Sequence, residues 1–210
     1  GSLNTATTTQ SGFEQFADAN QSGSGNSSLI TQSGAGNSAD VDQTGDDNDS
    51  QVVQQGNPFF TGVPNDVFVT QIGVANSSTV DAQNGDGSNT VDVDQTGTLN
   101  TSLIAQGSGA AAGNSIALTQ IGDSNQSTIT QASGIFADGN SISATQDGDR
   151  NVSLIDQQGF SNSITLFQGG ADNKSTIDQT GDSNTATVTQ TGAFDVSTVN
   201  QSGSGNTATV

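Results

Sequence analysis

Cysteine, histidine, tryptophan, tyrosine and methionine are all absent from the chain, and these absences remove whole classes of function. Without cysteine there can be no disulfide framework and no thiolate metal site. Without histidine, the abundant serines lack the usual base that activates a nucleophile, and only Lys174 could replace it. We therefore expect that the protein is not an enzyme and that it uses no cofactor and no metal.

Positive charge is almost absent as well. Arg150 and Lys174 are the only 2 basic residues against 21 acidic ones, which gives a formal net charge of −19 at pH 7. A nucleic-acid-binding protein needs a cationic surface, and so does a protein attracted to an anionic membrane. No apolar run is long enough to cross a bilayer. The composition argues against nucleic acid as a partner and against membrane insertion.

A short repeat fills the chain. Only 29% of the residues are hydrophobic, which is low for a globular core, but many of them are Val and Ile spaced by two. The repeating unit is Asn-x-ψ-x-ψ-x-Gln-x-Gly-x-x, where ψ is small or aliphatic, and it recurs eighteen times between Asn4 and the C-terminal end. Such alternation is typical of a strand with one buried face.

Neighbouring copies differ in a regular way. From the third copy on, odd copies place Ser at the first ψ, as at Ser102 and Ser153, while even copies place Ala, Val or Ile there. The true period is therefore two strands, or about 22 residues. We expect an all-β fold, a two-sheet β-solenoid or cross-β stack of about nine strand-turn-strand-turn coils. Successive coils would stack about 4.8 Å apart through parallel hydrogen bonds.

The pattern predicts one domain that covers residues 1–210 and is uncapped at both ends. Extra residues interrupt the spacing near 55–64, 84–88, 107–113 and 132–139, always after an odd copy, so these insertions should lie along one edge. A solenoid end without a cap exposes unpaired backbone. Repetition of an end-to-end contact would give an unlimited head-to-tail filament.

The recurring amides are the candidate functional residues. Stacked coils would place Asn over Asn and Gln over Gln, so that side-chain amides donate and accept along the stack. A buried amide without such a partner would cost on the order of 1–3 kcal/mol. We expect these structural amide ladders to include Asn26, Gln32, Asn37, Gln43, Asn100, Gln106, Asn114, Gln120, Asn173, Gln179, Asn184 and Gln190. The turn glycine should supply backbone angles that other residues avoid.

Phenylalanine is concentrated in the turns that follow odd copies. Phe59, Phe60 and Phe136 lie there, within the predicted insertions. Apolar side chains gathered on one side of a molecule suggest a contact surface. We take these three residues as a possible lateral contact between fibres or with a surface.

The paired unit resembles the curlin repeat of curli, the secreted bacterial amyloid fibre. The curlin pattern is Ser-x5-Gln-x4-Asn-x5-Gln, and its Gln-x4-Asn-x5-Gln part is reproduced by NSSLITQSGAGNSADVDQ (26–43) and NKSTIDQTGDSNTATVTQ (173–190). The resemblance implies a homopolymeric extracellular fibre, associated with the cell surface, that serves in biofilm matrix and adhesion. It also implies a nucleator subunit, an outer-membrane secretion pore and periplasmic chaperones as partners.

Two alternatives describe a monomeric β-solenoid binding module. An ice-binding protein needs a flat array of threonines on one sheet, which Thr5, Thr7 and Thr9 could form together with Thr185, Thr187 and Thr189. A calcium-dependent adhesin could use the carboxylates of Asp-rich turns. These turns hold Asp46, Asp47 and Asp49 in one place and Asp147 and Asp149 in another.

Overall fold

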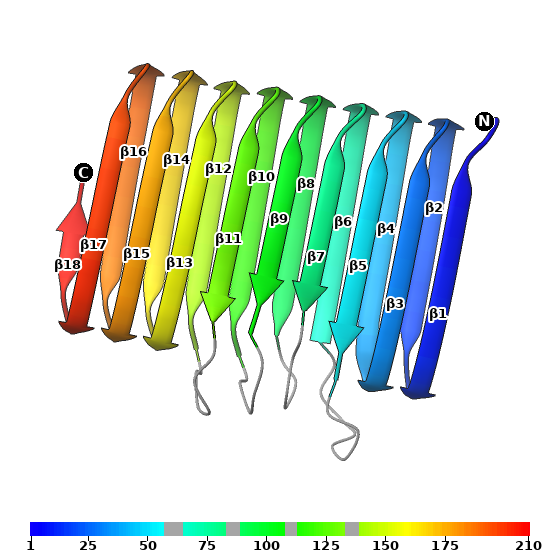
Figure 1. Ribbon diagram of the computed structural model, residues 1–210, viewed down its shortest axis with the longest axis horizontal. Helices are drawn as coiled ribbons and strands as arrows, with labels where there is room; N and C mark the ends of the chain where they lie inside the picture. Colours follow the sequence, from blue (N-terminus) through cyan, green and yellow to red (C-terminus); the bar gives the residue numbers. More distant parts are fainter. Residues whose placement is uncertain (57–64, 83–88, 108–112, 133–138) are drawn as a thin grey trace.

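The chain forms a β-solenoid of two facing sheets (Figure 1). The computed structural model describes residues 1–56, 65–82, 89–107, 113–132 and 139–210, and within these ranges it contains strands and no helix. Consecutive strands alternate between the two sheets, so each pair of strands closes one coil. The predicted all-β, two-sheet solenoid is confirmed.

Each sheet holds nine described strands. The odd sheet consists of β1 (Thr5–Phe13), β3 (Ser27–Ala35), β5 (Asp49–Gln55), β7 (Ser77–Ala82), β9 (Thr101–Gln106), β11 (Gln126–Ala132), β13 (Val152–Phe160), β15 (Lys174–Asp182) and β17 (Val196–Ser204). The even sheet consists of β2 (Phe16–Ser24), β4 (Asn37–Asp46), β6 (Asn65–Val74), β8 (Thr90–Thr98), β10 (Ser115–Asp123), β12 (Ser141–Asp149), β14 (Ser163–Ala171), β16 (Thr185–Ala193) and β18 (Thr207–Thr209).

All strand pairs are parallel and join equivalent positions of the repeat. Asn37 pairs with Asn65 and Gln43 with Gln71 between β4 and β6, and Gln179 pairs with Gln201 between β15 and β17. The register holds because a shift by one residue would turn every buried side chain outward. Identical interior residues are therefore stacked directly above one another along the solenoid.

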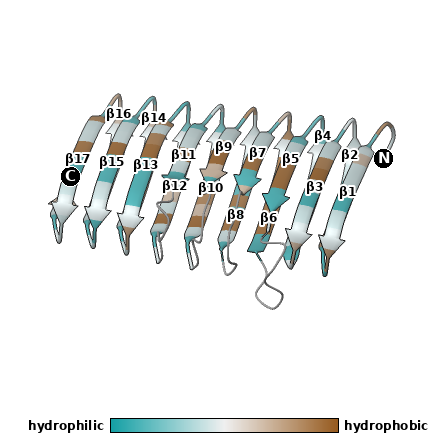
Figure 2. Cartoon of the chain, turned by 60° about the horizontal axis from the view of Figure 1, so that its bottom comes forward, coloured by the Kyte–Doolittle hydropathy of each residue, from teal (hydrophilic) through white to brown (hydrophobic). Residues whose placement is uncertain are grey.

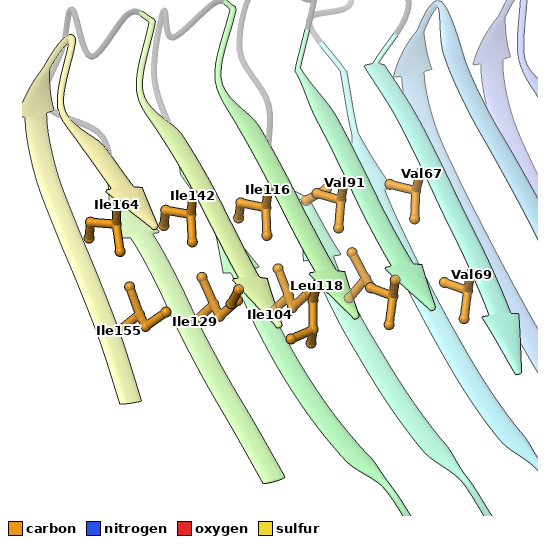
Figure 3. Close-up of a cluster of buried hydrophobic side chains, with 14 of the residues drawn as sticks. Val67, Val69, Val91, Ile104, Ile116, Leu118, Ile129, Ile142, Ile155 and Ile164 are labelled. Atoms are coloured by element: carbon orange, nitrogen blue, oxygen red, sulfur yellow. The ribbon is translucent and has the colours of Figure 1, made fainter. Parts of the chain in front are cut away.

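The core is a thin layer between the sheets. Figure 3 shows Val67, Val91, Ile116, Ile142 and Ile164 as one row from the even sheet, opposite a row that includes Ile129 and Ile155 from the odd sheet. These side chains are at most 1% exposed. The side chains of the even-sheet row become smaller toward both ends of the solenoid. They are Ala17 and Ala39 at one end and Ala186 and Ala208 at the other. The central coils therefore bury the most apolar surface.

Two backbone features recur at the described corners. The glycine two residues after the Gln usually has a positive φ, for example +106° at Gly122, and a Cβ there would overlap the carbonyl oxygen of Gly148 on the next coil. The residue just before the next Asn is also left-handed, and it is often not glycine, as with Leu99 (φ 59°) and Arg150 (φ 55°). The sequence pattern indicated the first feature and missed the second.

The insertions predicted at one edge fall largely on residues 57–64, 83–88, 108–112 and 133–138, which lie outside the described part of the chain. No helix in the described ranges is both long and apolar enough to span a bilayer. Figure 2 colours the described strands by hydropathy, and on β10 buried residues alternate with more exposed ones from Ser115 to Gln120.

Candidate functional site: amide ladders and outer strand edges

An unbroken column of glutamines runs through the even sheet. Each Nε2 donates to the Oε1 of the equivalent Gln one coil further toward the C-terminal end, over 2.8–2.9 Å. The column contains Gln21, Gln43, Gln71, Gln95, Gln120, Gln146, Gln168 and Gln190. All its bonds point the same way, so the column has a donor end and an acceptor end.

The same glutamines also join the two sheets. Gln120 Nε2 donates to the main-chain oxygen of Thr101 at the start of β9 (3.1 Å), and Gln168 Nε2 donates to that of Val152 at the start of β13 (3.2 Å). One amide therefore links its own coil to the next coil and to the opposite sheet. Only a side chain with one acceptor and two N–H donors can make this set of bonds.

The glutamine column of the odd sheet is interrupted at Ala82. Gln10, Gln32 and Gln54 form one block, and a second block consists of Gln106, Gln131, Gln157, Gln179 and Gln201. At the interruption Gln54 Nε2 donates instead to the main-chain oxygen of Asn65 (3.0 Å). On the other side Gln106 Oε1 is buried and has no hydrogen-bond partner among the described residues. The interruption therefore leaves an unsatisfied acceptor inside the solenoid.

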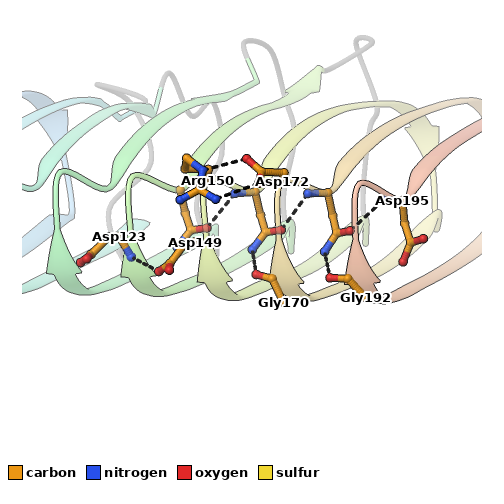
Figure 4. Close-up of polar contacts among 10 residues, drawn as sticks. Asp123, Asp149, Arg150, Gly170, Asp172, Gly192 and Asp195 are labelled. Carbon is orange, nitrogen blue, oxygen red and sulfur yellow. Dashed lines mark hydrogen bonds and ion pairs between the residues drawn. The ribbon is translucent and has the colours of Figure 1, made fainter.

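The asparagine side chains at the corners form hydrogen bonds with different partners from those of the glutamines. Figure 4 shows the column at one edge, where the main-chain N–H of Asn173 donates to Asn151 Oδ1 (3.1 Å) and that of Asp195 donates to Asn173 Oδ1 (2.9 Å). The side-chain Nδ2 of Asn151 donates to the Gly170 oxygen (3.0 Å), and Asn173 does the same to Gly192 (3.1 Å). These side chains thus connect mainly to backbone, where the sequence reading expected amide-to-amide bonds.

Some amide-to-amide bonds do occur between asparagines, as from Asn48 Nδ2 to Asn26 Oδ1 (3.1 Å) and from Asn206 Nδ2 to Asn184 Oδ1 (2.9 Å). The structure buries every amide that the sequence singled out. These are Asn26, Gln32, Asn37, Gln43, Asn100, Gln106, Asn114, Gln120, Asn173, Gln179, Asn184 and Gln190. They lie in four columns, two for each sheet, at the two ends of the inward-facing rows.

The serines at the first inward position also pair, but only two at a time. Ser102 and Ser78 hydroxyl oxygens are 3.0 Å apart, and those of Ser153 and Ser127 are 2.8 Å apart. The hydroxyls of Ser28 and Ser50 are buried and have no hydrogen-bond partner within the described part of the chain. A hydroxyl has only one proton to donate, so the serine column contributes less regularly than the amides do.

One ion pair crosses neighbouring corners. The Arg150 guanidinium binds both carboxylate oxygens of Asp172 at 2.8 Å, and both residues have left-handed backbones (Figure 4). The hydrogen bond from Arg150 lowers the pKa of the Asp172 carboxyl below its ordinary value. Because the Arg150 side chain is 58% exposed, solvent screens the pair and its contribution to stability is small.

Carboxyl groups stack on the outer face of the even sheet near the N-terminal end. Asp18 pairs in register with Asp40, and Asp42 lies two residues further along β4. Burial raises the pKa of the Asp40 carboxyl, and repulsion from Asp42 and then Asp18 raises it further. Burial likewise raises the pKa of Asp66, and burial followed by repulsion from Asp94 raises that of Asp92. The sequence reading missed this stacking, which the shared repeat position of Asp18 and Asp40 could have indicated.

The prediction that two groups of threonines form one ice-binding array on a single sheet is wrong. Thr5, Thr7 and Thr9 lie on β1 in the odd sheet, whereas Thr185, Thr187 and Thr189 lie on β16 in the even sheet. The first group belongs to an odd copy of the repeat and the second to an even copy, so the two cannot share a face. For the Asp-rich turns, no group of three or more acidic residues in the described ranges is arranged to hold a metal ion.

Of the phenylalanines expected to make a lateral contact, Phe59, Phe60 and Phe136 lie outside the described residues. Three others near the same edge are described: Phe13 is 72% exposed, Phe16 57% and Phe160 41%. The lateral contact stays a prediction.

The described stack ends in a strand edge on each sheet. At one end lie β1 and β2, and at the other β17 and β18. Every residue of β1 is exposed, including Thr8, which pairs in register with the fully buried Ile30. Among the described strands, none pairs with the outward edge of β1 or of β17.

Comparison with known families matches the Curlin associated repeat to residues 1–34, 29–56, 137–166, 159–192 and 181–210. A search of curated proteins found no match. Between the matched segments, β6 to β11 continue the same two sheets in the same register. The matches cover more than half of the chain and agree in spacing with the stacked coils, so this chain belongs to the family of proteins built from curlin repeats.

Proposed function

We propose that the chain is a structural subunit that assembles head to tail with copies of itself into a curli-like amyloid fibre. The fibre would be extracellular, attached to the cell surface, and would serve in biofilm matrix and adhesion. The observation that carries the proposal is the register of the stack, in which each coil places on the next the same interior columns that it shares with the coil before. The edge strand of such a stack is a template for pairing with another chain.

The interior offers a second copy the same contacts that coils make within one chain. Addition of one more coil at the register of β15 and β17 would place Gln10 of the next copy over Gln201. It would also place Thr5 over Val196 and Gly12 over Gly203. Each of these pairings continues a column already present, so the joint needs no new type of interaction.

The direction of the glutamine bonds favours one mode of assembly. Gln179 donates to Gln201 toward the C-terminal end, and Gln10 donates to Gln32 in the same direction. Gln201 therefore has an N–H left for a further coil, while Gln10 has its Oε1 left to accept one. A head-to-head joint would oppose two acceptors, so the bonds favour head-to-tail growth, which gives open filaments.

Family membership supports the remaining parts of the proposal. Curlin repeats are associated with secreted extracellular curli fibres, so we place this chain with a nucleator subunit, a secretion pore and periplasmic chaperones. We also propose that it acts without catalysis and without a cofactor. The repeated interior consists of amides, hydroxyls and aliphatic groups, which bind each other along the stack.

A charge placed at the joint tests the proposal. The variant Thr8→Lys puts an ammonium on an inward-facing position of β1. This position is exposed in one chain, but in the proposed joint it would be buried against Val199 of a second copy. We expect the variant to fold but to stop elongation from wild-type seeds, because burial of an unpaired charge is strongly unfavourable. Elongation is followed by the rise in β-sheet circular dichroism and by electron microscopy.

Thr7→Lys is the matched control, since Thr7 lies on the same strand with its side chain on the outer face. It should elongate at close to the wild-type rate. Equal elongation by both variants would contradict the proposed joint. A wild-type chain that stays monomeric in the presence of seeds would contradict the proposed function itself.

A further inference from the structure

A small apolar patch lies at the edge where even strands lead into odd ones. We call Ile72, Val74, Leu99 and Ile121 the edge patch; their side chains are 46%, 44%, 56% and 43% exposed. Ile72 and Ile121 flank Thr96 in register, so they lie two coils apart on one line. The equivalent positions on the neighbouring coils are occupied by Thr44 and Asp147. On this line the isoleucines are therefore confined to the middle coils, although the corner position itself also carries exposed apolar residues nearer the ends, Leu3 and Phe194.

Leu99 occupies a position that disfavours it. Its φ of 59° is left-handed, and the same corner position carries Gly25 or Asp47 on other coils. A branched side chain there costs on the order of 1 kcal/mol, while glycine and asparagine adopt this conformation easily. Leu99 is more than half exposed, so burial in the core does not offset the strain. Phe194 is left-handed and exposed as well, so strain alone does not mark a site; Leu99 differs because its main-chain N–H donates to the oxygen of Val74 in the edge patch (3.0 Å).

A groove adjoins the edge patch. It has a volume of about 410 Å³ and runs over β2, β4 and β6, with Ile72 as its apolar wall. Its other lining includes Thr70, the small side chains of Ser22 and Thr44, and the carboxylate of Asp42. Asn20 Nδ2 donates to Asp42 Oδ1 over 3.0 Å and holds that carboxylate in the groove. An apolar anchor and a negative charge thus lie side by side.

Carboxylates surround the patch on its other sides. Asp42 and Asp94 flank Thr70 in register, Asp46 pairs with Val74, and Asp123 pairs with Thr98 next to Leu99. The two basic residues are engaged or distant: Arg150 binds Asp172, and Lys174 belongs to β15 in the odd sheet. A second copy of this chain, at a net charge of −19, would be repelled from such a surface.

We propose that the edge patch and its groove form a docking site for a cationic segment of another protein, in which basic side chains alternate with branched apolar ones. The apolar side chains cover Ile72, Leu99 and Ile121, and a lysine or arginine enters the groove beside Asp42. This arrangement follows the usual division of an interface into an apolar centre and a charged rim. The site is separate from the strand edges at the ends of the stack.

The test uses a short peptide, Lys-Leu-Ser-Leu-Lys, labelled with an uncharged dye, and measures its fluorescence anisotropy against the 210-residue protein. A peptide with Glu in place of both Lys is the charge control. We expect the Lys peptide to bind and the Glu peptide not to bind. A rise in ionic strength from about 0.05 to 0.5 M should weaken the binding several-fold.

The decisive variant is Leu99→Asn. Asparagine tolerates the left-handed backbone, so the variant should be at least as stable to urea as the wild type, whereas its affinity for the peptide should fall about tenfold. Phe194→Asn is the matched control, because Phe194 has the same backbone conformation (φ 65°) and 75% exposure on a distant coil. It should gain stability in the same way and bind the peptide normally.

Equal binding of the two peptides, or an unchanged affinity in Leu99→Asn, would overturn the proposal. So would an equal loss of affinity in Phe194→Asn. If Leu99→Asn instead reduced self-association in sedimentation experiments, the occupant would be a second copy and the proposal would also be wrong.

Discussion

Removal of one glutamine from the unbroken column is the sharpest test of what holds the coils together. Gln120 lies in the middle of this column, on β10, and is fully buried. It accepts from Gln95 (2.8 Å) and donates to Gln146 (2.8 Å) and to the Thr101 main chain (3.1 Å). The variant Gln120→Ala breaks all three bonds at once.

The expected cost follows from the groups left behind. Gln146 Oε1 and the Thr101 oxygen lose their donor, and Gln95 loses an acceptor for one N–H. Each buried polar group left unpaired costs about 1–3 kcal/mol, and water that enters the space recovers part of this. We expect the free energy of unfolding to fall by about 3–5 kcal/mol, a large fraction of the stability of a typical domain.

Urea unfolding followed by circular dichroism measures this loss. Trypsin supplies a second probe, because Arg150 and Lys174 are the only two sites at which it can cleave. Gln120→Ala should increase the cleavage rate as it increases the population of unfolded chain. Thr119→Ala, an outward neighbour on the same strand, should change the unfolding free energy by less than about 0.5 kcal/mol. A cost of Gln120→Ala no greater than that of Thr119→Ala would refute the reasoning.

Further predictions concern the interruption, the corners and the outer carboxyls. Ala82→Gln should raise the urea midpoint by supplying a donor to Gln106 Oε1; an unchanged midpoint would contradict this. In the same urea assay Gly122→Ala should lower the free energy of unfolding by about 3 kcal/mol. Gly205→Ala should lower it by less, because both glycines have a positive φ but a Cβ would meet the backbone of the next coil only at Gly122. Lower pH should stabilise the fold, because Asp40, Asp66 and Asp92 have a higher pKa in the folded chain than in the unfolded chain, where it is near 3.8. The stability that these carboxyls contribute is fully present below the unfolded pKa and is lost as the pH rises through the folded pKa. Comparison of urea midpoints at pH 7 and about pH 4.5 tests this, and the shift should shrink when Asn replaces Asp40, Asp66 and Asp92.

Much of the fold could be predicted because the same alternation of inward and outward residues recurs in every copy of the repeat. Alternation of inward and outward residues identified the strands, and the Ser or aliphatic residue at the first inward position separated the two sheets. Gln120 and Gln179 were predicted to lie in columns from their spacing alone, and the structure places them there. The interruption at Ala82 was visible as the one internal copy without Gln at its closing position.

Other features depend on geometry that residue spacing does not carry. The Asn173 side chain bonds to backbone because the corner brings a glycine carbonyl and a main-chain N–H beside it, which requires knowledge of the corner itself. The left-handed position of Leu99 was hidden because non-glycine residues occupy it on many coils. The threonine array failed because Thr5 and Thr185 were compared without the parity of their copies.

The one-way glutamine column has an electrical consequence for the whole molecule. Hydrogen bonds between parallel strands alternate in direction, so sheet backbones have only a small net dipole. The side-chain amides from Gln21 to Gln190 instead align, with their N–H groups toward the C-terminal end. Aligned amide dipoles add, as they do in a helix. The solenoid therefore carries a macrodipole along its axis, and a filament of such units would orient in an electric field.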